Sequence, residues 1–185
     1  MSTALLIIDV QCALCTGPEA AFDIGRVIAR INALATIARR SRLPVILIQH
    51  EEKEGALQYD TAGWKLAPTL VTDPGDLRMR KTTPDSFHHT DLQRRLEERQ
   101  VDHLVICGLQ SDYCVDTTVR RALAHGYHVT LVADAHSTID NGVLTAAQIT
   151  AHHNQTLQHL HSFGLRMMVV PTHDLVDGLL RQKTA

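Results

Sequence analysis

Aromatic residues are scarce in this sequence, the net charge is small, and long apolar runs are missing. Aromatics form 4% of the 185 residues, too few for the stacking surfaces on which single-stranded nucleic acids bind. The formal net charge of -2 arises from 18 basic and 20 acidic side chains, which indicates no basic patch for nucleic acid. No apolar run approaches the ~20 residues of a membrane-spanning helix. We therefore expect neither nucleic acid nor membrane as a partner.

Features of an export signal are also missing. The segment MSTALLIIDVQ has no basic region and reaches Asp9 too early for a signal peptide, so we expect a cytoplasmic protein. In a reducing compartment cysteines are expected to be thiols, and there are four: Cys12, Cys15, Cys107 and Cys114. The length and a hydrophobic content of 44% fit a single domain over residues 1–185, with a core that needs no disulfide or metal.

Apolar runs alternate with segments of helical periodicity along the chain. Apolar runs without polar alternation indicate strands buried on both faces, and we expect such strands at 4–8, 45–48, 104–107, 129–133 and 167–170, with a further short strand at 77–80. Helices are expected from about residue 23, from Thr90 on its capping-box spacing with Gln93, after Cys114, over 142–163, and from about 173. This alternation predicts an α/β fold whose largely parallel sheet is covered on both faces.

Three reactive side chains are predicted at one edge of that sheet. Asp9 ends the first strand, Lys81 follows the third, and Cys114 lies in the turn after the fourth. Parallel sheets bind ligands outside the carboxyl ends of their strands. Residues far apart in the sequence should therefore meet at a single site.

Cys114 is the candidate nucleophile. A thiol near a helix N-terminus meets the positive end of the helix dipole and unpaired backbone N–H groups, which favour the reactive thiolate. Those N–H groups could also bind an oxyanion. The alternative is a buried, inert thiol, which is the usual state of a free cysteine and the one we expect for Cys107.

Asp9 and Lys81 have plausible supporting roles. The Asp9 carboxylate could accept the thiol proton and deliver it to a leaving group, and Lys81 could stabilise the thiolate electrostatically. Each also has an ordinary structural interpretation, as a capping aspartate and as a surface lysine. Their predicted convergence with Cys114 favours the catalytic interpretation.

Other polar patterns are weaker candidates. Cys12-x-x-Cys15 has a redox spacing without the strand-to-helix context of thioredoxin-like motifs. The pairs His88-His89 and His152-His153 are poor metal sites, because adjacent helix residues do not share a face. We expect no metal and no cofactor.

Several segments, in the same order, resemble those of the isochorismatase-like cysteine hydrolases, which include nicotinamidases and N-carbamoylsarcosine amidases. The resemblance covers nearly the whole chain. Its marks are LLIIDVQ, ILIQH, Gly63-Trp64, Lys81 with Ser86-Phe87, VICGLQSDYCVDTTVRRALAHGYHVTLVADA and HHNQTLQHLHSFG. The segment around Cys114 is the most specific of them.

This resemblance implies a three-layer, Rossmann-like α/β/α fold with a six-stranded, mostly parallel sheet, and an Asp9-Lys81-Cys114 triad. It further implies a cis peptide between Leu109 and Gln110, and an oxyanion hole formed by the N–H groups of Gln110 and Cys114. Homodimers or homotetramers are expected, as is a small-molecule substrate. Candidate substrate-binding residues are Gln11, His50, Trp64, Phe87 and Tyr113.

The chain departs from some family patterns, which bears on its chemistry. Metal-binding nicotinamidases carry Asp-x-His after the second strand, where this chain has Gln49-His50-Glu51-Glu52. Several true isochorismatases, which cleave a vinyl ether, lack the cysteine. Retention of Cys114 favours hydrolysis of an amide or related C–N bond. The alternatives are thiol-independent vinyl-ether hydrolysis and a catalytically idle protein that binds a small molecule or partner.

Overall fold

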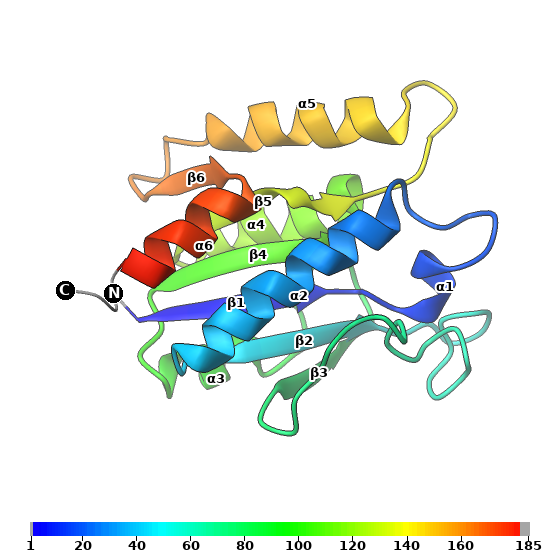
Figure 1. Ribbon diagram of the computed structural model, residues 1–185, viewed down its shortest axis with the longest axis horizontal. Helices are drawn as coiled ribbons and strands as arrows, with labels where there is room; N and C mark the ends of the chain where they lie inside the picture. The colour runs from blue at the N-terminus through cyan, green and yellow to red at the C-terminus, as the bar shows by residue number, and fades with distance from the viewer. Residues whose placement is uncertain (1, 182–185) are drawn as a thin grey trace.

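Helices separate most of the strands in the computed structural model, which describes residues 2–181 (Figure 1); β2 and β3 follow each other without a helix between them. The strands are β1 (Thr3–Ile8), β2 (Val45–His50), β3 (Leu77–Lys81), β4 (His103–Leu109), β5 (His128–Ser137) and β6 (Met167–Val170). The helices are α1 (Cys12–Cys15), α2 (Ile24–Arg40), α3 (Leu92–Glu97), α4 (Asp116–Ala124), α5 (Ala146–Gln158) and α6 (Thr172–Arg181). A π-helical turn, η1 (Ser111–Val115), leads directly into α4.

The strands form one sheet in the order β3-β2-β1-β4-β5-β6, and every pairing is parallel. This agrees with the six-stranded sheet implied by the sequence. The chain progresses outward from β1 on one side and from β4 on the other. The crevice outside the carboxyl ends of these two central strands is therefore the expected ligand position in a doubly wound fold.

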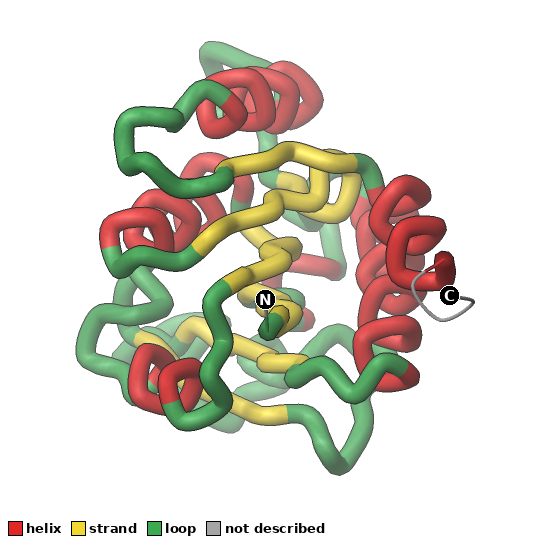
Figure 2. Tube along the Cα trace, turned by 90° about the vertical axis from the view of Figure 1, so that its left-hand side faces the viewer, coloured by secondary structure: helices red, strands yellow, loops and turns green. Residues whose placement is uncertain are grey.

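Helices cover both faces of the sheet, which gives the predicted three layers (Figure 2). Helices α3, α4 and α5 contribute to the core on one face, and α2 and α6 pack on the other. The apolar run of β1 supplies both cores, because alternate side chains point to opposite faces: Leu6 and Ile8 enter one core, and Leu5 and Ile7 the other. Within the described residues, no helix has the length and hydropathy needed to span a bilayer.

Two expected helix starts were wrong for local reasons. α5 begins at Ala146 rather than at residue 142, because Thr145 and Gln148 form a reciprocal capping box there. The proposed box at Thr90 and Gln93 does not form. The Thr90 hydroxyl instead donates to the carbonyl oxygen of Ser86, and α3 spans only Leu92–Glu97.

Candidate active site

The backbone around Asp9 aims its side chain across the central crevice. Asp9 has φ 53°, in the left-handed region that aspartate tolerates better than most residues. Its N–H donates to the carbonyl oxygen of Ile48 at 2.8 Å, and its own carbonyl accepts from the N–H of Gln11 at 2.8 Å. The chain thus turns sharply at the end of β1, and the Asp9 side chain becomes almost fully buried.

Gly108 allows β4 to approach β1 at the same level. It pairs with Ile8 and has φ +117°, and a Cβ added there would lie 2.1 Å from the carbonyl oxygen of Ile8. Any side chain would push the two strands apart. The peptide bond between Leu109 and Gln110 is cis, as the family resemblance implied, and the chain then enters η1, which carries Cys114. π-helical turns are rare and are often found at functional sites.

Lys81 connects the groups that converge here. Its fully buried ammonium Nζ lies 2.7 Å from Asp9 Oδ2, 3.1 Å from Cys114 Sγ, 3.2 Å from the carbonyl oxygen of Thr83 and 3.3 Å from His50 Nδ1. An ammonium has three protons to donate, so these four acceptors share them. The structure therefore brings the three predicted triad residues together, with His50 beside them.

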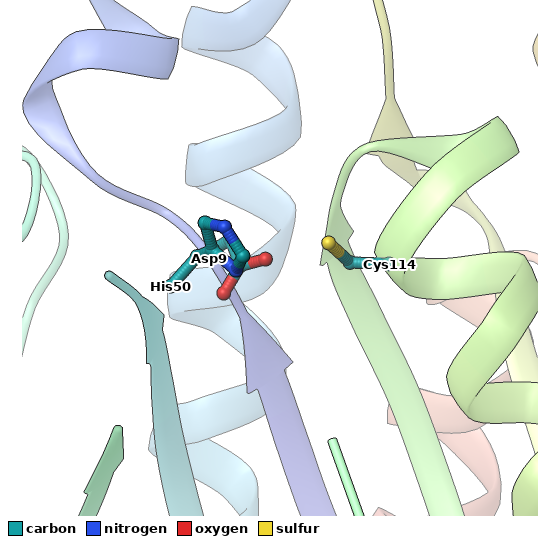
Figure 3. A group of neighbouring side chains, drawn as sticks. All are labelled: Asp9, His50 and Cys114. Carbon is teal, nitrogen blue, oxygen red and sulfur yellow. The ribbon is translucent and has the colours of Figure 1, made fainter. Parts of the chain in front are cut away.

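One oxygen of Asp9 remains free to take part in chemistry. Oδ2 accepts from Lys81, whereas Oδ1 is buried and has no hydrogen-bond partner among the described residues. A buried carboxylate oxygen without a partner is costly, and such atoms often mark a functional site. Figure 3 shows Asp9 and His50 together at the ends of their strands, with the Cys114 sulfur facing them from the opposite side of the crevice.

Charges and burial fix the protonation state of the lysine and the thiol. Burial alone would lower the pKa of Lys81, but the neighbouring Asp9 carboxylate and Cys114 outweigh it, so the net pKa is raised. Burial raises the pKa of the Cys114 thiol to about 12; the Asp9 carboxylate adds to the rise, and Lys81 opposes it. Burial therefore outweighs the favourable effect of Lys81 on the thiolate, which the sequence alone did not indicate.

The same donors do not fit a resident metal ion. One donor atom each of Asp9, His50 and Cys114 lies within 4.8 Å of the others, and these are ligand types that zinc accepts. However, the Lys81 ammonium lies within hydrogen-bonding distance of all three. Burial and then Lys81 lower the pKa of His50, so a neutral imidazole can accept from Lys81 through Nδ1. A cation here would face a positive charge already bound to every ligand.

The other sequence-predicted residues occupy different environments. Gln11 is fully buried; its amide donates to the carbonyl oxygens of His50 and Trp64 and accepts from the His50 N–H. Phe87 lies in the core, where it stacks on Tyr127. Gln11 therefore supports the site through hydrogen bonds, and Phe87 supports it through core packing.

Three further candidates lie around the crevice. Tyr113 is 56% exposed on η1, immediately before Cys114. Trp64 packs edge-on against Tyr59 and lines a cavity of about 640 Å³ that also touches Lys81 and extends along β3. Gln110 lies at the start of η1, beside the cis peptide.

Sequence patterns did not reveal the groups that hold η1 in place. The hydroxyl of Ser111 bonds to the buried imidazole of His136, and the Asp112 carboxylate accepts from the hydroxyl of Thr138 at 2.6 Å. His136 and Thr138 lie at and just after the end of β5. The sequence contained one sign of these groups. It is the polar run His136-Ser137-Thr138, which ends an apolar strand at the edge of the sheet where ligands are expected to bind.

Comparison with known proteins places the chain in a family. The Isochorismatase domain family matches residues 3–168. A streptothricin hydrolase of Streptomyces noursei is 38% identical over 138 residues, which cover 74% of this chain and 50% of that protein. The ureidoacrylate amidohydrolase RutB of Caulobacter vibrioides is 26% identical over 171 residues, covering 72% of this chain and 76% of that protein. The chain thus spans about half the length of the streptothricin hydrolase it matches.

Solved structures agree with this assignment. The crystal structure of an isochorismatase from Pseudomonas putida superposes with a TM-score of 0.81 at 32% identity, covering 93% of this chain and 89% of that one. Together with the family match over 3–168, this shows that the chain belongs to the isochorismatase family. The resemblance seen in the sequence is thereby confirmed.

Proposed function

We propose that this protein is a cysteine hydrolase that cleaves an amide or related C–N bond of a small molecule through a thioester on Cys114. The observation that carries the proposal is the buried Lys81 ammonium, which bridges Asp9 and Cys114 at 2.7 and 3.1 Å. In the proposal, Asp9 is the base, Cys114 the nucleophile and Lys81 a fixed positive charge, all in one desolvated site.

The raised pKa of Cys114 determines the order of events. Because the thiol rests protonated, the attacking thiolate must form during the reaction, with its proton passing from Sγ to the Asp9 carboxylate. Oδ1 of Asp9, which has no other partner among the described residues, is suited to accept it. Lys81 then stabilises the negative charge as it develops on sulfur.

The later steps use the same groups. The thiolate attacks the substrate carbonyl, and the resulting oxyanion accepts hydrogen bonds from the N–H groups of Gln110 and Cys114. As the C–N bond breaks, Asp9 returns its proton to the leaving amine. Water then attacks the thioester, giving the carboxylic acid product and restoring the Cys114 thiol.

The known relatives support C–N chemistry over ether cleavage. One is named as an amidohydrolase and another as a hydrolase of streptothricin. Within our proposal, Trp64, His50 and Tyr113 contact the substrate from the loops around the crevice. We further propose that the active form is a homodimer or homotetramer, which sedimentation velocity would measure directly.

A matched pair of cysteine variants tests the proposal. Cys114→Ala should lower turnover of amides, ureas or carbamates by at least ~10³-fold, because the nucleophile is lost. Cys107→Ala, at a fully buried thiol in β4, should leave kcat within a few-fold of the wild type. Intact-mass spectrometry of the quenched wild-type enzyme should reveal the acyl adduct, which Cys114→Ala should lack.

Different failures have different meanings. Turnover that survives in Cys114→Ala would refute covalent catalysis and point to thiol-independent cleavage, with a vinyl-ether substrate the first to examine. A thermal shift with small amides that are bound but never cleaved by the wild type would instead identify a binding protein.

A further inference from the structure

A chain of buried and part-buried hydrogen bonds runs from α5 to the turn that carries Cys114. Ser111 Oγ lies 2.8 Å from His136 Nδ1 and 3.2 Å from Thr150 Oγ1, and His136 Nε2 lies 2.8 Å from Asn154 Oδ1. The Asn154 amide nitrogen donates at 2.9 Å to the carbonyl oxygen of Ala133. None of these groups belongs to the Asp9-Lys81-Cys114 cluster.

The backbone carbonyl of Ala133, together with a neutral imidazole at His136, sets the direction of each bond in this chain. Because Asn154 Nδ2 donates to that carbonyl, its Oδ1 must be the acceptor from His136 Nε2–H. His136 Nδ1 is then unprotonated and accepts from the Ser111 hydroxyl. Ser111 Oγ is in turn left to accept from the Thr150 hydroxyl. Each side chain has one consistent role.

Protonation of the imidazole would reverse part of this chain. His136 is almost fully buried, and this burial lowers its pKa to about 4. A second proton, on Nδ1, would donate to Ser111 Oγ, and the Ser111 hydroxyl would have to turn towards Thr150 Oγ1 instead. The network is therefore fixed in one arrangement at neutral pH.

This chain ends on the first residue of η1, three positions before the nucleophile. The next residue, Asp112, is also tied to the β5 side by its 2.6 Å bond with Thr138. From the opposite side of the crevice, Lys81 contacts Cys114 at 3.1 Å. The sulfur is thus held between a polar anchor behind the turn and the ammonium in front of it.

We infer that Ser111 and His136 are positioning residues that hold the π-helical turn so that Cys114 Sγ stays in line with Asp9 and Lys81. The inference rests on the proposed role of Cys114 as nucleophile. A displacement of about 1 Å at a reacting atom can cost on the order of 100-fold in rate, so loss of the anchor should appear in kcat. Two of the three proposed substrate contacts, Trp64 and His50, lie outside η1, so substrate affinity should change less than kcat.

The opposite edge of the sheet offers a matched control. There the Thr130 hydroxyl lies 2.9 Å from the ring of His103, so it makes a similar, though only part-buried, hydroxyl–imidazole bond far from Cys114. Ser111→Ala and Thr130→Ala each remove one such hydroxyl. Ser111→Thr retains the hydroxyl and provides the conservative rescue.

The experiment compares kcat and KM of these three variants, after their folding has been checked by cooperative thermal unfolding. We expect Ser111→Ala to lower kcat by about 10- to 100-fold with KM within about threefold, while Ser111→Thr and Thr130→Ala stay near the wild type. Equal kcat in Ser111→Ala and the wild type would overturn the inference. Equal losses of kcat in Ser111→Ala and Thr130→Ala would also overturn it, because kcat would then respond to a lost hydroxyl–imidazole bond anywhere in the fold.

Two further measurements test the inference if Ser111→Ala does not fold or if the proposed function fails. If Ser111→Ala does not fold, Thr150→Val removes the hydroxyl at the far end, beside a cavity of about 220 Å³, and should lower kcat in the same direction. If Cys114→Ala retains turnover, the proposed function fails by itself. The anchor is then tested by the rate of Cys114 alkylation at pH 9, which should differ between Ser111→Ala and Thr130→Ala and would refute the inference if it did not.

Discussion

The two edges of the same sheet bury polar groups in opposite ways. At the amino edge, His103 bridges three strands through the hydroxyls of Thr3 and Thr130, at 3.1 and 2.9 Å. At the carboxyl edge, Asp9, Lys81 and Cys114 meet as a charged cluster in which Asp9 Oδ1 lacks a partner among the described residues. At the amino edge both ring nitrogens of His103 have hydrogen-bond partners, whereas at the carboxyl edge one buried carboxylate oxygen has none among the described residues.

The two edges of the sheet also differ in backbone conformation. The carboxyl edge contains the left-handed Asp9, the close contact at Gly108 and the π-helical turn before α4. The residues at the amino edge begin ordinary strands with a regular register. Left-handed residues also occur in turns just before β2 and β4, at Arg42 and Gln100, so the close contact at Gly108 and the π-helical turn are what set the carboxyl edge apart.

The largest effect should come from removing the charge that links the carboxyl-edge cluster. Lys81→Met should lower kcat by about 10³-fold, because neither the developing thiolate nor Asp9 would face a positive charge. Leaving Asp9 buried without its partner should also reduce the free energy of unfolding by about 3–5 kcal/mol. Steady-state kinetics and urea unfolding measure both effects.

A surface arginine on the same strand supplies the control for that variant. Arg78→Met removes an exposed cation from β3 and should change neither quantity appreciably. If Lys81→Met kept near-native turnover, the carboxyl edge would be no more reactive than the amino edge.

Alkylation of Cys114 should next reveal how strongly burial suppresses its thiolate. With a pKa of about 12, Cys114 should react with iodoacetamide at pH 7.5 at least ~10²-fold more slowly than a free small thiol. The rate should rise about tenfold per pH unit above that. Peptide mass mapping reads each cysteine separately. Rapid labelling of Cys114 near pH 6 would show instead that Lys81 dominates over burial.

Acid should destabilise the protein through His136. Its pKa of about 4 in the folded state lies below the unperturbed 6.5, so the unfolded chain binds the proton more readily as pH falls. The stabilisation is complete above pH 6.5 and is lost as pH falls from there towards 4, by about 3 kcal/mol. Urea unfolding of the wild type and His136→Asn at pH 7.5 and 4.5 measures it. Parallel pH profiles for the two proteins would contradict the assignment.

The smallest effect is expected at the amino edge. Thr130→Ala should reduce the free energy of unfolding by about 1–2 kcal/mol, because His103 loses a hydrogen-bond partner. Its kcat should match the wild type. A large loss of kcat would show that the two edges are coupled and that the contrast between them is incomplete.

Strands were predicted more successfully than helix ends, and the reason is physical. An apolar run such as Leu5–Ile8 is visible in the sequence because both faces of the strand are buried. Helix boundaries depend on which of several possible caps forms. Thr145 forms its capping box, whereas Thr90 donates to Ser86 instead. The four-residue helix α1 and the π-helical turn η1 have too little periodicity to be seen.

The candidate site, too, was predicted from the sequence only in part. Asp9, Lys81 and Cys114 were predicted to converge because each follows a strand of a parallel sheet, and the structure brings them together. The protonation state of Cys114 could not be foreseen, since it depends on how deeply the surrounding chain buries the sulfur. Bonds such as Ser111 to His136 join side chains that no local pattern relates.

The long-range hydrogen bonds of Gln11 have a consequence for the order in which segments of the chain fold. Its amide joins the end of β1 to the backbone of His50 and Trp64, residues 39 and 53 positions away in the sequence. Such distant contacts carry a loop-closure cost that is met only after the flanking strands have paired. The loop that contains Trp64 should therefore become ordered late, after β1 and β2 have joined, and it should be among the first segments to open when the native protein fluctuates.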